Sequence, residues 1–319
     1  MPKLRWDQYL TIVLILLLSL ITSVQSAQQL TLPSIHQQPI TLLEPGLLAV
    51  QTATASAQAN LFADFTASVS AQAVYVIDLP TAAVLLSKNN QQLLYPASTT
   101  KMITALVARE TYALDQVLTV ESEASTEGNG MGLQLQEKIS VANLLTGLLV
   151  NSGNDAAYTL ANHHPQGYEG FIKAMNQKAQ DLHLDQSHFK NPSGFDHPEQ
   201  LTTAHDLAIL AQALMQDEFL RNLVATPKIA VTDITGKINH YLVNTNSLLT
   251  SEAGVVGIKT GTTELAGEVL ITQLETNAQQ LLIVVMNSQH RYADTKKIIN
   301  WIFANYYWVD YNRAIAQQQ

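Results

Sequence analysis

The sequence contains no cysteine among its 319 residues. Disulfides, thiol nucleophiles and cysteine-ligated metals are therefore excluded, and stability must come from a packed core. Charged residues are also scarce, at 13%, and acidic side chains outnumber basic ones by 26 to 17, which gives a formal net charge of −9. A field of that sign repels polyanions and argues against nucleic acid as a partner.

Apolar residues are abundant, in contrast to charged ones. They make up 47% of the chain, which is enough to bury a sizeable core and argues against intrinsic disorder. The length exceeds that of a typical single domain, so one large or two modest domains are compatible with it.

The N-terminal segment has the pattern of an export signal. Lys3 and Arg5 precede an apolar run over residues 10–24, and small residues follow up to Ser26. This pattern predicts a signal peptide at residues 1–26, cleaved after Ser26. The run is shorter than the ~20 residues that span a bilayer comfortably, although an uncleaved N-terminal anchor remains an alternative. We therefore expect an exported protein, periplasmic or otherwise extracytoplasmic, with membrane contact only through this segment.

The rest of the chain divides by composition. Residues 27–65 are rich in Gln, Ala, Thr and Leu with scattered prolines, and we interpret them as a spacer or poorly ordered arm. Regular periodicity begins soon afterwards, so a folded domain is expected over residues 66–308. Residues 309–319 are expected to form a short tail.

Hydrophobic periodicity predicts an alternation of strands and helices in the folded part. The expected strands are 74–77, 82–86, 255–259, 268–273 and 280–286. The expected helices begin at Lys101 and cover 141–150, 155–161, 168–182, 204–215 and, as the last element, 293–306. A hairpin, a helical block, returning strands and a terminal helix describe an α+β fold with one sheet covered by helices.

Three short polar motifs stand in order along this pattern. Ser98-Thr99-Thr100-Lys101 opens a predicted helix, Ser152-Gly153-Asn154 lies between two predicted helices, and Lys259-Thr260-Gly261 ends a predicted strand. A serine hydroxyl needs a base within hydrogen-bond reach to become a good nucleophile. Positions i and i+3 share a helix face, so Lys101 is expected beneath Ser98. Burial and a second cation, with Lys259 the obvious choice, would lower the pKa of Lys101 and make it a base.

Each motif alone has an ordinary structural interpretation. Ser98 could be a helix N-cap, the second motif a polar loop and the third a strand-to-turn junction. Their order is more specific, because S-x-x-K, an S-D-N-type triplet and K-T-G occur together in penicillin-binding proteins and class A β-lactamases. The middle triplet here is S-G-N, which departs from S-D-N.

Longer segments around these motifs resemble the D-alanyl-D-alanine carboxypeptidase family, the low-molecular-mass penicillin-binding proteins. The similar segments are Y-P-A-S-T-T-K-M-I-T-A-L (95–106), 131–157, 171–182, 188–196, 201–208 and G-I-K-T-G-T-T-E-L-A-G (257–267). The resemblance runs from about residue 73 to 308. It implies a β-lactamase/transpeptidase-like fold, an antiparallel sheet packed by helices with a helical subdomain.

The resemblance also implies roles for single residues. Ser98 would attack the carbonyl of the penultimate D-Ala, Lys101 would accept its proton and Ser152 would relay that proton to the leaving D-Ala. The substrate-binding set that it implies is Asn154, Lys259, Thr260, Gly261, Thr262 and Arg291. The oxyanion would be bound by the backbone N–H groups of Ser98 and Thr262. Peptidoglycan stem peptides and β-lactam antibiotics are the expected partners, and no cofactor or metal is expected.

The chain departs from the family pattern in several places. Thr262 stands where relatives often have an aromatic residue or His, and Gln136-Glu137 replaces a more usual Gly-Glu, which we expect to affect only a turn. Many relatives continue into a β-rich second domain and an amphipathic membrane helix, for which the tail 309–319 has no room.

Other polar residues are expected to be structural. His163-His164 suggests a loop and shows no spacing typical of a metal site. Asp155 is expected to cap the next helix, and Asp206 to make structural hydrogen bonds.

Three alternatives to a carboxypeptidase remain at this point. A D,D-endopeptidase would cut cross-links instead of stem ends. A β-lactamase would need a deacylating Glu on a separate loop, and no E-x-x-L-N stretch is present. A non-catalytic β-lactam or wall sensor would not need the nucleophile, base and relay residues that the chain retains.

Overall fold

The computed structural model describes residues 47–51, 64–121, 127–276 and 279–310. The predicted signal peptide and most of the predicted spacer lie outside these residues. Within the described ranges, no helix has both the length and the apolar character that crossing a membrane requires.

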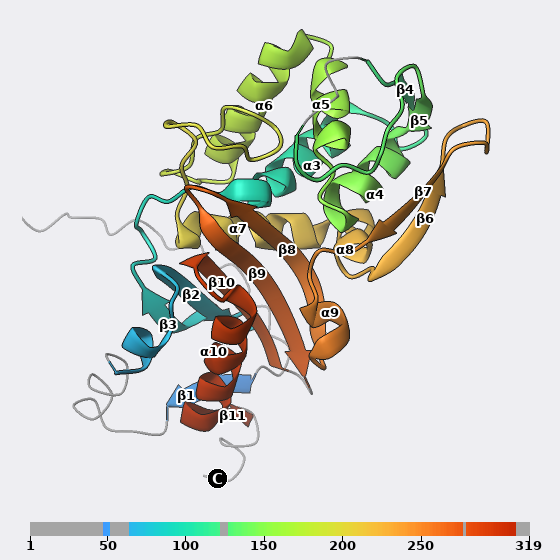
Figure 1. Ribbon diagram of the computed structural model, residues 1–319. Coiled ribbons are helices and arrows are strands. Elements are labelled where there is room, and N and C mark those ends of the chain that lie inside the picture. The colour runs from blue at the N-terminus through green and yellow to red at the C-terminus, as the bar shows by residue number, and fades with distance from the viewer. Residues whose placement is uncertain (1–46, 52–63, 122–126, 277–278, 311–319) are drawn as a thin grey trace, which may run out of the picture. The chain divides into compact units, whose positions relative to one another are not determined.

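The described chain is an α+β fold, which confirms the predicted fold class (Figure 1). Its strands are β1 (Leu47–Gln51), β2 (Ala73–Asp78), β3 (Ala83–Lys88), β4 (Val117–Thr119), β5 (Lys138–Ser140), β6 (Lys228–Thr232), β7 (Asn239–Val243), β8 (Val255–Thr263), β9 (Gly267–Thr276), β10 (Gln279–Ser288) and β11 (Tyr306–Asp310). Its helices are the 3₁₀ turn η1 (Ala97–Thr100), α3 (Lys101–Thr111), α4 (Val141–Val150), α5 (Asn154–Asn162), α6 (Gly167–Asp181), α7 (Ala204–Gln216), α8 (Glu218–Val224), α9 (Leu248–Ser251) and α10 (Arg291–Asn305).

A five-stranded antiparallel sheet forms the centre, in the order β3-β2-β10-β9-β8. The sheet joins the first hairpin of the domain to its last three strands, so β2 pairs with β10 although about 200 residues separate them. β8 is an edge strand of this sheet. It contains the third motif and lies next to η1.

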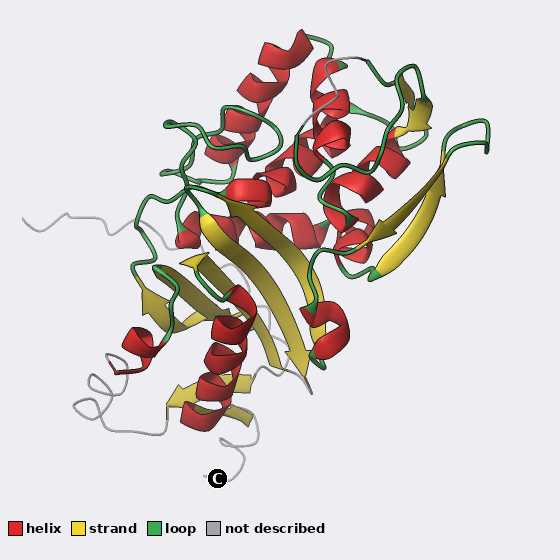
Figure 2. Cartoon of the chain, in the orientation of Figure 1, coloured by secondary structure: helices red, strands yellow, loops and turns green. Residues whose placement is uncertain are grey.

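Both faces of the sheet are covered, which explains the nearly continuous apolar sequences of β2 and β10. Alternate residues of β10 contribute to different cores because strand side chains point to opposite faces in turn. Leu281, Ile283 and Val285 pack with Ile298 and Ile302 of α10. The residues between them, Leu282, Val284 and Met286, belong to a larger core that includes α7 and the other helices. Figure 2 shows α10 against one face of the sheet, α7 behind the other face, and the remaining long helices gathered above the sheet in this view.

The helical block is held together by that larger core. α3 is its central element, since eight of its eleven residues are buried and it contacts α4, α5, α6 and α7. A helix that is apolar on nearly every side is typical of a central packing position. This burial fixes the direction of Lys101 at the first turn of α3.

The two ends of the described chain form a separate two-stranded sheet, in which β1 pairs with β11 from Leu47↔Asp310 to Gln51↔Tyr306. Residues 47–51 are therefore a strand and not part of an unstructured spacer. The last predicted helix also ends before Tyr306, and β11 follows it. Pairing between segments this far apart in sequence leaves no local periodicity to detect.

The predicted helices and sheet strands are present with small shifts of their ends, whereas the shorter elements were not predicted. These are β4 with β5, α8, the hairpin of β6 and β7, and α9. Elements of three to seven residues have too few positions to show a period, so tertiary packing decides their conformation.

Candidate active site

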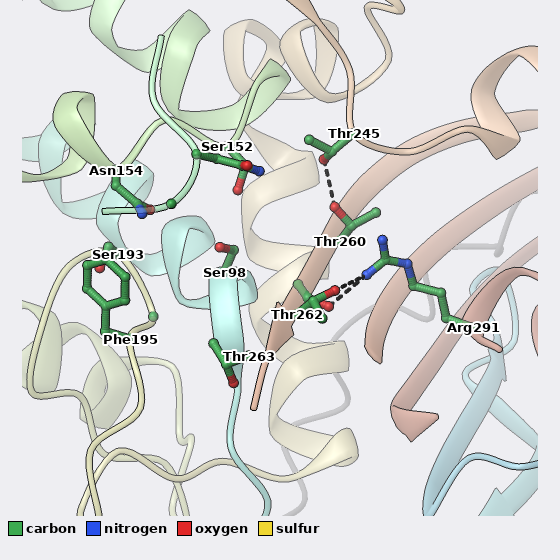
Figure 3. Close-up of a pocket in the computed structure, with 14 residues that line it drawn as sticks. Ser98, Ser152, Asn154, Ser193, Phe195, Thr245, Thr260, Thr262, Thr263 and Arg291 are labelled. Carbon is green, nitrogen blue, oxygen red and sulfur yellow. Dashed lines mark hydrogen bonds between the residues drawn. The ribbon is translucent and has the colours of Figure 1, made fainter. Parts of the chain in front are cut away.

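The nucleophile segment begins with a tight turn. Ser98 lies in η1, and the α-helix starts only at Lys101, so Ser98 precedes the helix instead of opening it. Ala97 has a left-handed backbone (φ 48°), a conformation that costs a residue with a Cβ about 1 kcal/mol or more. The turn places the Ser98 side chain at the mouth of a cavity (Figure 3).

Lys101 lies beneath this serine and is fully buried. Its Nζ is 3.0 Å from Ser98 Oγ, 2.7 Å from Asn154 Oδ1 and 2.6 Å from the carbonyl oxygen of Ser193. Burial and then the nearby Lys259 charge hold the pKa of Lys101 well below its usual value. A neutral Lys101 keeps two hydrogens for Asn154 Oδ1 and Ser193 O and turns its lone pair toward the Ser98 hydroxyl. The surroundings of this amine therefore suit a general base.

The second motif bridges α4 and α5. Ser152 has a left-handed backbone (φ 59°), and Asn154 is the first residue of α5. Ser152 Oγ accepts a hydrogen bond from Lys259 Nζ at 2.8 Å. Besides accepting from Lys101, Asn154 donates from Nδ2 to the carbonyl of Glu127 at 2.7 Å, which leaves one amide hydrogen for another acceptor.

The third motif lies inside β8 and does not end it. The strand continues to Thr263, because its ladder with β9 extends to Thr263↔Gly267. Lys259 is buried, and burial together with the Arg291 charge lowers its pKa to about 7. The two lysines are thus buried amines behind the cavity, each linked by a hydrogen bond to one of the two serines.

Two glycines permit the sheet and a loop to approach the nucleophile turn. A Cβ on Gly261 would lie 2.8 Å from Ala97 Cβ and 2.9 Å from Ser98 N. A Cβ on Gly194 (φ 94°) would lie 1.9 Å from Ala97 O, where no side chain fits. Gly261 therefore has a packing role as well as its place in the predicted binding set.

The outer part of the β8 wall is polar. Thr260 Oγ1 lies 2.6 Å from Thr245 Oγ1. Arg291, at the start of α10, donates from Nη1 to Gly261 O at 2.8 Å and to Thr262 Oγ1 at 2.6 Å (Figure 3). These contacts position the guanidinium at the cavity, as the resemblance implied.

The opposite wall is a segment over residues 127–133, which we call the rim segment. Asp155 accepts hydrogen bonds from the backbone N–H groups of Met131, Gly132 and Leu133, at 2.9, 2.9 and 3.1 Å. The prediction that Asp155 acts as a helix cap is therefore wrong: Gly153 is the N-cap, and the carboxylate mainly holds the rim segment. Asp206 makes structural hydrogen bonds to Gln186 N and Ser187 Oγ, as predicted.

The cavity enclosed by these elements has a volume of about 470 Å³. Its lining residues are Ser98, Gly128, Asn129, Ser152, Asn154, Ser193, Gly194, Phe195, Thr245, Thr260, Gly261, Thr262, Thr263 and Arg291. All nine predicted site residues come together here, seven in the lining and the two lysines buried behind it. The arrangement combines a hydroxyl, a buried amine base and a cationic wall, which suits acyl transfer on a substrate with a carboxylate.

Sequence reasoning missed several contributors to this cavity. The Ser193 carbonyl, Thr245, Phe195 and the rim segment act through their position and carry no motif of their own. The available signals were the similarities of residues 188–196 and 131–157 to the family, which assigned no role to the Ser193 carbonyl or to the rim segment.

Known proteins are similar to the part of the chain that contains most of these site residues. The sequence profile of the D-alanyl-D-alanine carboxypeptidase family matches residues 54–290. The D-alanyl-D-alanine carboxypeptidase DacF of Bacillus subtilis is 33% identical over 245 residues, which cover 74% of this chain and 63% of DacF. A D-alanyl-D-alanine endopeptidase of Escherichia coli is also 33% identical, over 71% of this chain and 75% of its own length.

Solved structures agree with the sequence comparison. The Streptomyces K15 DD-transpeptidase is 29% identical with a TM-score of 0.70, and the match covers 74% of this chain and 98% of that one. A D-alanyl-D-alanine carboxypeptidase from Mycobacterium tuberculosis is 30% identical with a TM-score of 0.69, over 74% and 92% of the two chains. The chain spans just under two thirds of the length of DacF but nearly all of these two structures. The protein belongs to the D-alanyl-D-alanine carboxypeptidase family.

Proposed function

We propose that the protein is a serine-type D-Ala-D-Ala carboxypeptidase that removes the terminal D-alanine from peptidoglycan stem peptides. The observation that carries this proposal is the fully buried Lys101 amine, 3.0 Å from the Ser98 hydroxyl. A Ser–Lys pair with a lowered lysine pKa is a means of activating a nucleophile without His or a metal.

Acylation would begin with proton transfer from Ser98 to the neutral Lys101 as Ser98 Oγ attacks the carbonyl carbon of the penultimate D-Ala. The backbone N–H groups of Ser98 and Thr262 would bind the oxyanion. Ser152 would give its hydroxyl proton to the leaving amine while taking up the proton held by Lys101, so that free D-Ala departs, an ester on Ser98 remains and Lys101 is neutral again. Water would then hydrolyse that ester.

The cationic wall would recognise the terminal carboxylate. Lys259, Thr260 and Arg291 lie on one side of the cavity, and the free amide hydrogen of Asn154 could bind the substrate backbone. A β-lactam has a carboxylate in the corresponding place, so we expect it to acylate Ser98. Deacylation of that adduct should be slow, and rapid nitrocefin turnover would favour a β-lactamase instead.

A D,D-endopeptidase is the second candidate. Two relatives named D-alanyl-D-alanine endopeptidases are 30–33% identical to this chain, close to the identities of 30–33% found for relatives named carboxypeptidases. Both activities break the bond that follows a D-Ala carbonyl, so the catalytic residues do not distinguish them.

The proposed site of action is outside the cytoplasm, where peptidoglycan is accessible. The signal-like sequence at residues 1–26 and the family membership support this location. Mass spectrometry of the mature protein from cells would show whether the segment is removed or retained as a tether.

The proposal is tested by incubating the full-length protein with pentapeptide muropeptides, both monomeric and cross-linked, followed by mass spectrometry. Ser98→Ala removes the nucleophile, and Ser251→Ala, at an exposed serine of α9, is the matched control. Loss of one D-Ala from monomers with dimers intact would support a carboxypeptidase. Cleavage of dimers alone would identify an endopeptidase, and no Ser98-dependent change in either substrate would refute both.

A further inference from the structure

A buried ion pair lies outside the cavity and has no place in the proposed reaction. His240 of β7 and Glu137, just before β5, are both nearly inaccessible, and His240 Nε2 lies 2.7 Å from Glu137 Oε1. The sequence suggested that Gln136-Glu137 affects only a turn. Gln136 does occupy a left-handed turn position (φ 65°), but Glu137 turns inward to meet the histidine.

The other hydrogen bonds of His240 and Glu137 indicate which of their atoms carry a hydrogen. His240 Nδ1 lies 3.0 Å from the Met131 carbonyl, which can only accept, so Nδ1 carries a hydrogen. Glu137 Oε2 accepts from the backbone N–H of Gln134 at 2.9 Å. The contact between Nε2 and Oε1 is therefore a hydrogen bond only when one additional proton lies between them. Without that proton, two lone pairs would face each other in a buried site.

Met131 connects this pair to the active site. Its carbonyl accepts from His240 while its N–H donates to Asp155. The rim segment is also tied to α5 where Asn154 donates from Nδ2 to Glu127 O and from its backbone N–H to Asn129 O. One face of the rim segment is thus held by the catalytic motif, and the other by the pair of His240 and Glu137.

The hairpin that carries His240 is itself anchored. Ile234 N donates to Lys138 O at 2.9 Å, and Asn143 Nδ2 of α4 donates to Thr232 O at 2.7 Å. These bonds hold the β6–β7 hairpin against β5 and α4, so His240 reaches Met131 from a fixed support.

We propose that His240 and Glu137 are positioning residues whose shared proton locks the Met131 carbonyl and thereby holds the rim segment, and with it Asn154, in the geometry for acylation. This inference rests on the proposed function, because it assigns the pair a role in that reaction. Reacting groups displaced by about 1 Å can cost about 100-fold in rate, so a small movement of the rim segment has a measurable effect.

Other charged groups near the pair are engaged elsewhere. Asp155 binds the rim backbone, and Asp233 accepts from the N–H groups of its own turn between β6 and β7. Lys138 and Lys228 are exposed, and α4 has no charged residue. Glu137 is therefore the charged partner of His240 in this contact.

Glu137→Gln gives a sharp test. The amide oxygen can still accept from Gln134 N, and the amide nitrogen can donate to a neutral His240 Nε2, so every hydrogen bond is kept without the carboxylate charge. Glu137→Leu removes both bonds, and Glu218→Gln, at an exposed glutamate of α8, is the control. The rate constant for acylation by a fluorescent penicillin is measured at neutral pH, with melting temperatures to confirm folding.

We expect Glu137→Gln to be acylated at close to the wild-type rate, because its hydrogen bonds are kept, while Glu137→Leu loses about tenfold or more. A loss in Glu137→Gln as large as that in Glu137→Leu would overturn the proposal, as would full activity of a folded Glu137→Leu.

A measurement independent of activity separates this proposal from the proposed function. Backbone amide hydrogen exchange at Met131, Gly132 and Leu133 should be faster in Glu137→Leu than in the wild type, and should be restored in Glu137→Gln. If exchange follows this order but no acylation is detected in any protein, the proposed function fails, whereas the conclusion that His240 and Glu137 hold the rim segment stands. Unchanged exchange in Glu137→Leu would show that His240 and Glu137 do not hold the rim segment.

Discussion

The two walls of the active site are constructed in different ways. On the helical side, Ser98, Lys101 and Ser152 lie in turns and at a helix start, and both Ala97 and Ser152 have left-handed backbones. On the sheet side, Lys259 to Thr262 belong to the regular ladder of β8 with β9. The groups proposed to move protons are thus held mainly by side-chain hydrogen bonds and burial, and those proposed to bind carboxylate mainly by strand pairing. Damage to a single side-chain contact should therefore be felt most on the helical side.

The largest effect on rate is expected for Lys101→Gln. The amide can still donate to Asn154 Oδ1 and Ser193 O but has no basic nitrogen, so the variant separates the base from the hydrogen bonds. We expect acylation by penicillin to fall by about 10²–10⁴-fold, the usual contribution of a general base. Stopped-flow or gel-based measurement of Ser98 acylation gives the rate.

Lys173→Gln, on the exposed face of α6, is the control for this change. A melting temperature near that of the wild type would confirm that the variant folds. Acylation of Lys101→Gln at close to the wild-type rate would place the base elsewhere and remove the basis for the contrast between the two walls.

A second prediction concerns the close approach at Gly194. Its alanine Cβ would fall 1.9 Å from Ala97 O, so the nucleophile turn must shift. We expect acylation to fall by about 100-fold, because displacement of Ser98 disturbs the geometry of attack. Gly236→Ala is a matched control, since Gly236 is also left-handed (φ 70°) but has open space around its Cβ position.

Both glycine variants should lose about 1 kcal/mol of unfolding free energy from backbone strain. Gly194→Ala should lose more because of its overlap with Ala97, and only Gly194→Ala should lose activity. Chemical denaturation measures the first quantity and penicillin acylation the second. Equal acylation rates in the two variants would show that the turn tolerates movement.

The third prediction addresses the sheet side. Burial and then the Arg291 charge lower the pKa of Lys259 to about 7, so in the free enzyme its positive charge is present below about pH 7 and is lost as the pH rises. The second-order rate constant for acylation should therefore fall on the alkaline side. Arg291→Gln removes one of the two causes, raises the pKa of Lys259 and should move this alkaline limb to higher pH.

The pH at which the acylation rate constant falls is measured separately from its maximum value. Arg291→Gln can also lower that maximum by weakening carboxylate binding. The pH dependence is best measured with a penicillin, because its carboxylate stays ionised over the whole range. A limb that does not move would mean that Lys259 is not the group whose charge is lost.

The same contrast explains what could be predicted from the sequence. Long periodic helices such as α3, α4 and α7 and the central strands were predictable, because their apolar spacing is local. Three motifs and the family resemblance were enough to name the nine residues that meet at the cavity. The left-handed backbones at Ala97 and Ser152, which help to bring them together, were not predictable. Ala97 and Ser152 have left-handed backbones because tertiary contacts impose them, and a sequence of ordinary residues gives no signal for that.

Long-range partners account for the other failures. The continuation of β8 past Gly261 depends on β9, the strand β1 depends on β11, and Glu137 meets a histidine 103 residues away. None of these pairings has a local pattern. The interpretation of Asp155 as a cap failed for the same reason, since its main partners are in the rim segment.

The smallest effects are expected for ion pairs far from the cavity, one in each region. Arg109 of α3 donates to Asp217 at 2.9 Å and lies over the Phe219 ring, with its centre 5.8 Å away. Lys296 of α10 pairs with Glu252 at 2.8 Å but is more exposed, 43% against 27%. Arg109→Met should cost about 1 kcal/mol, from the pair and the cation–π contact together, and Lys296→Met less than about 0.5 kcal/mol.

Thermal unfolding at low and high salt checks this order, because screening should reduce the cost of Lys296→Met more than that of Arg109→Met. Neither variant should change the acylation rate of the folded protein. A larger cost for Lys296→Met would mean that exposed charges on the sheet side contribute more to stability than the partly buried pair on the helical side. Strand pairing alone would then not account for the stability of the sheet side, and the contrast between the two sides would be weaker than proposed.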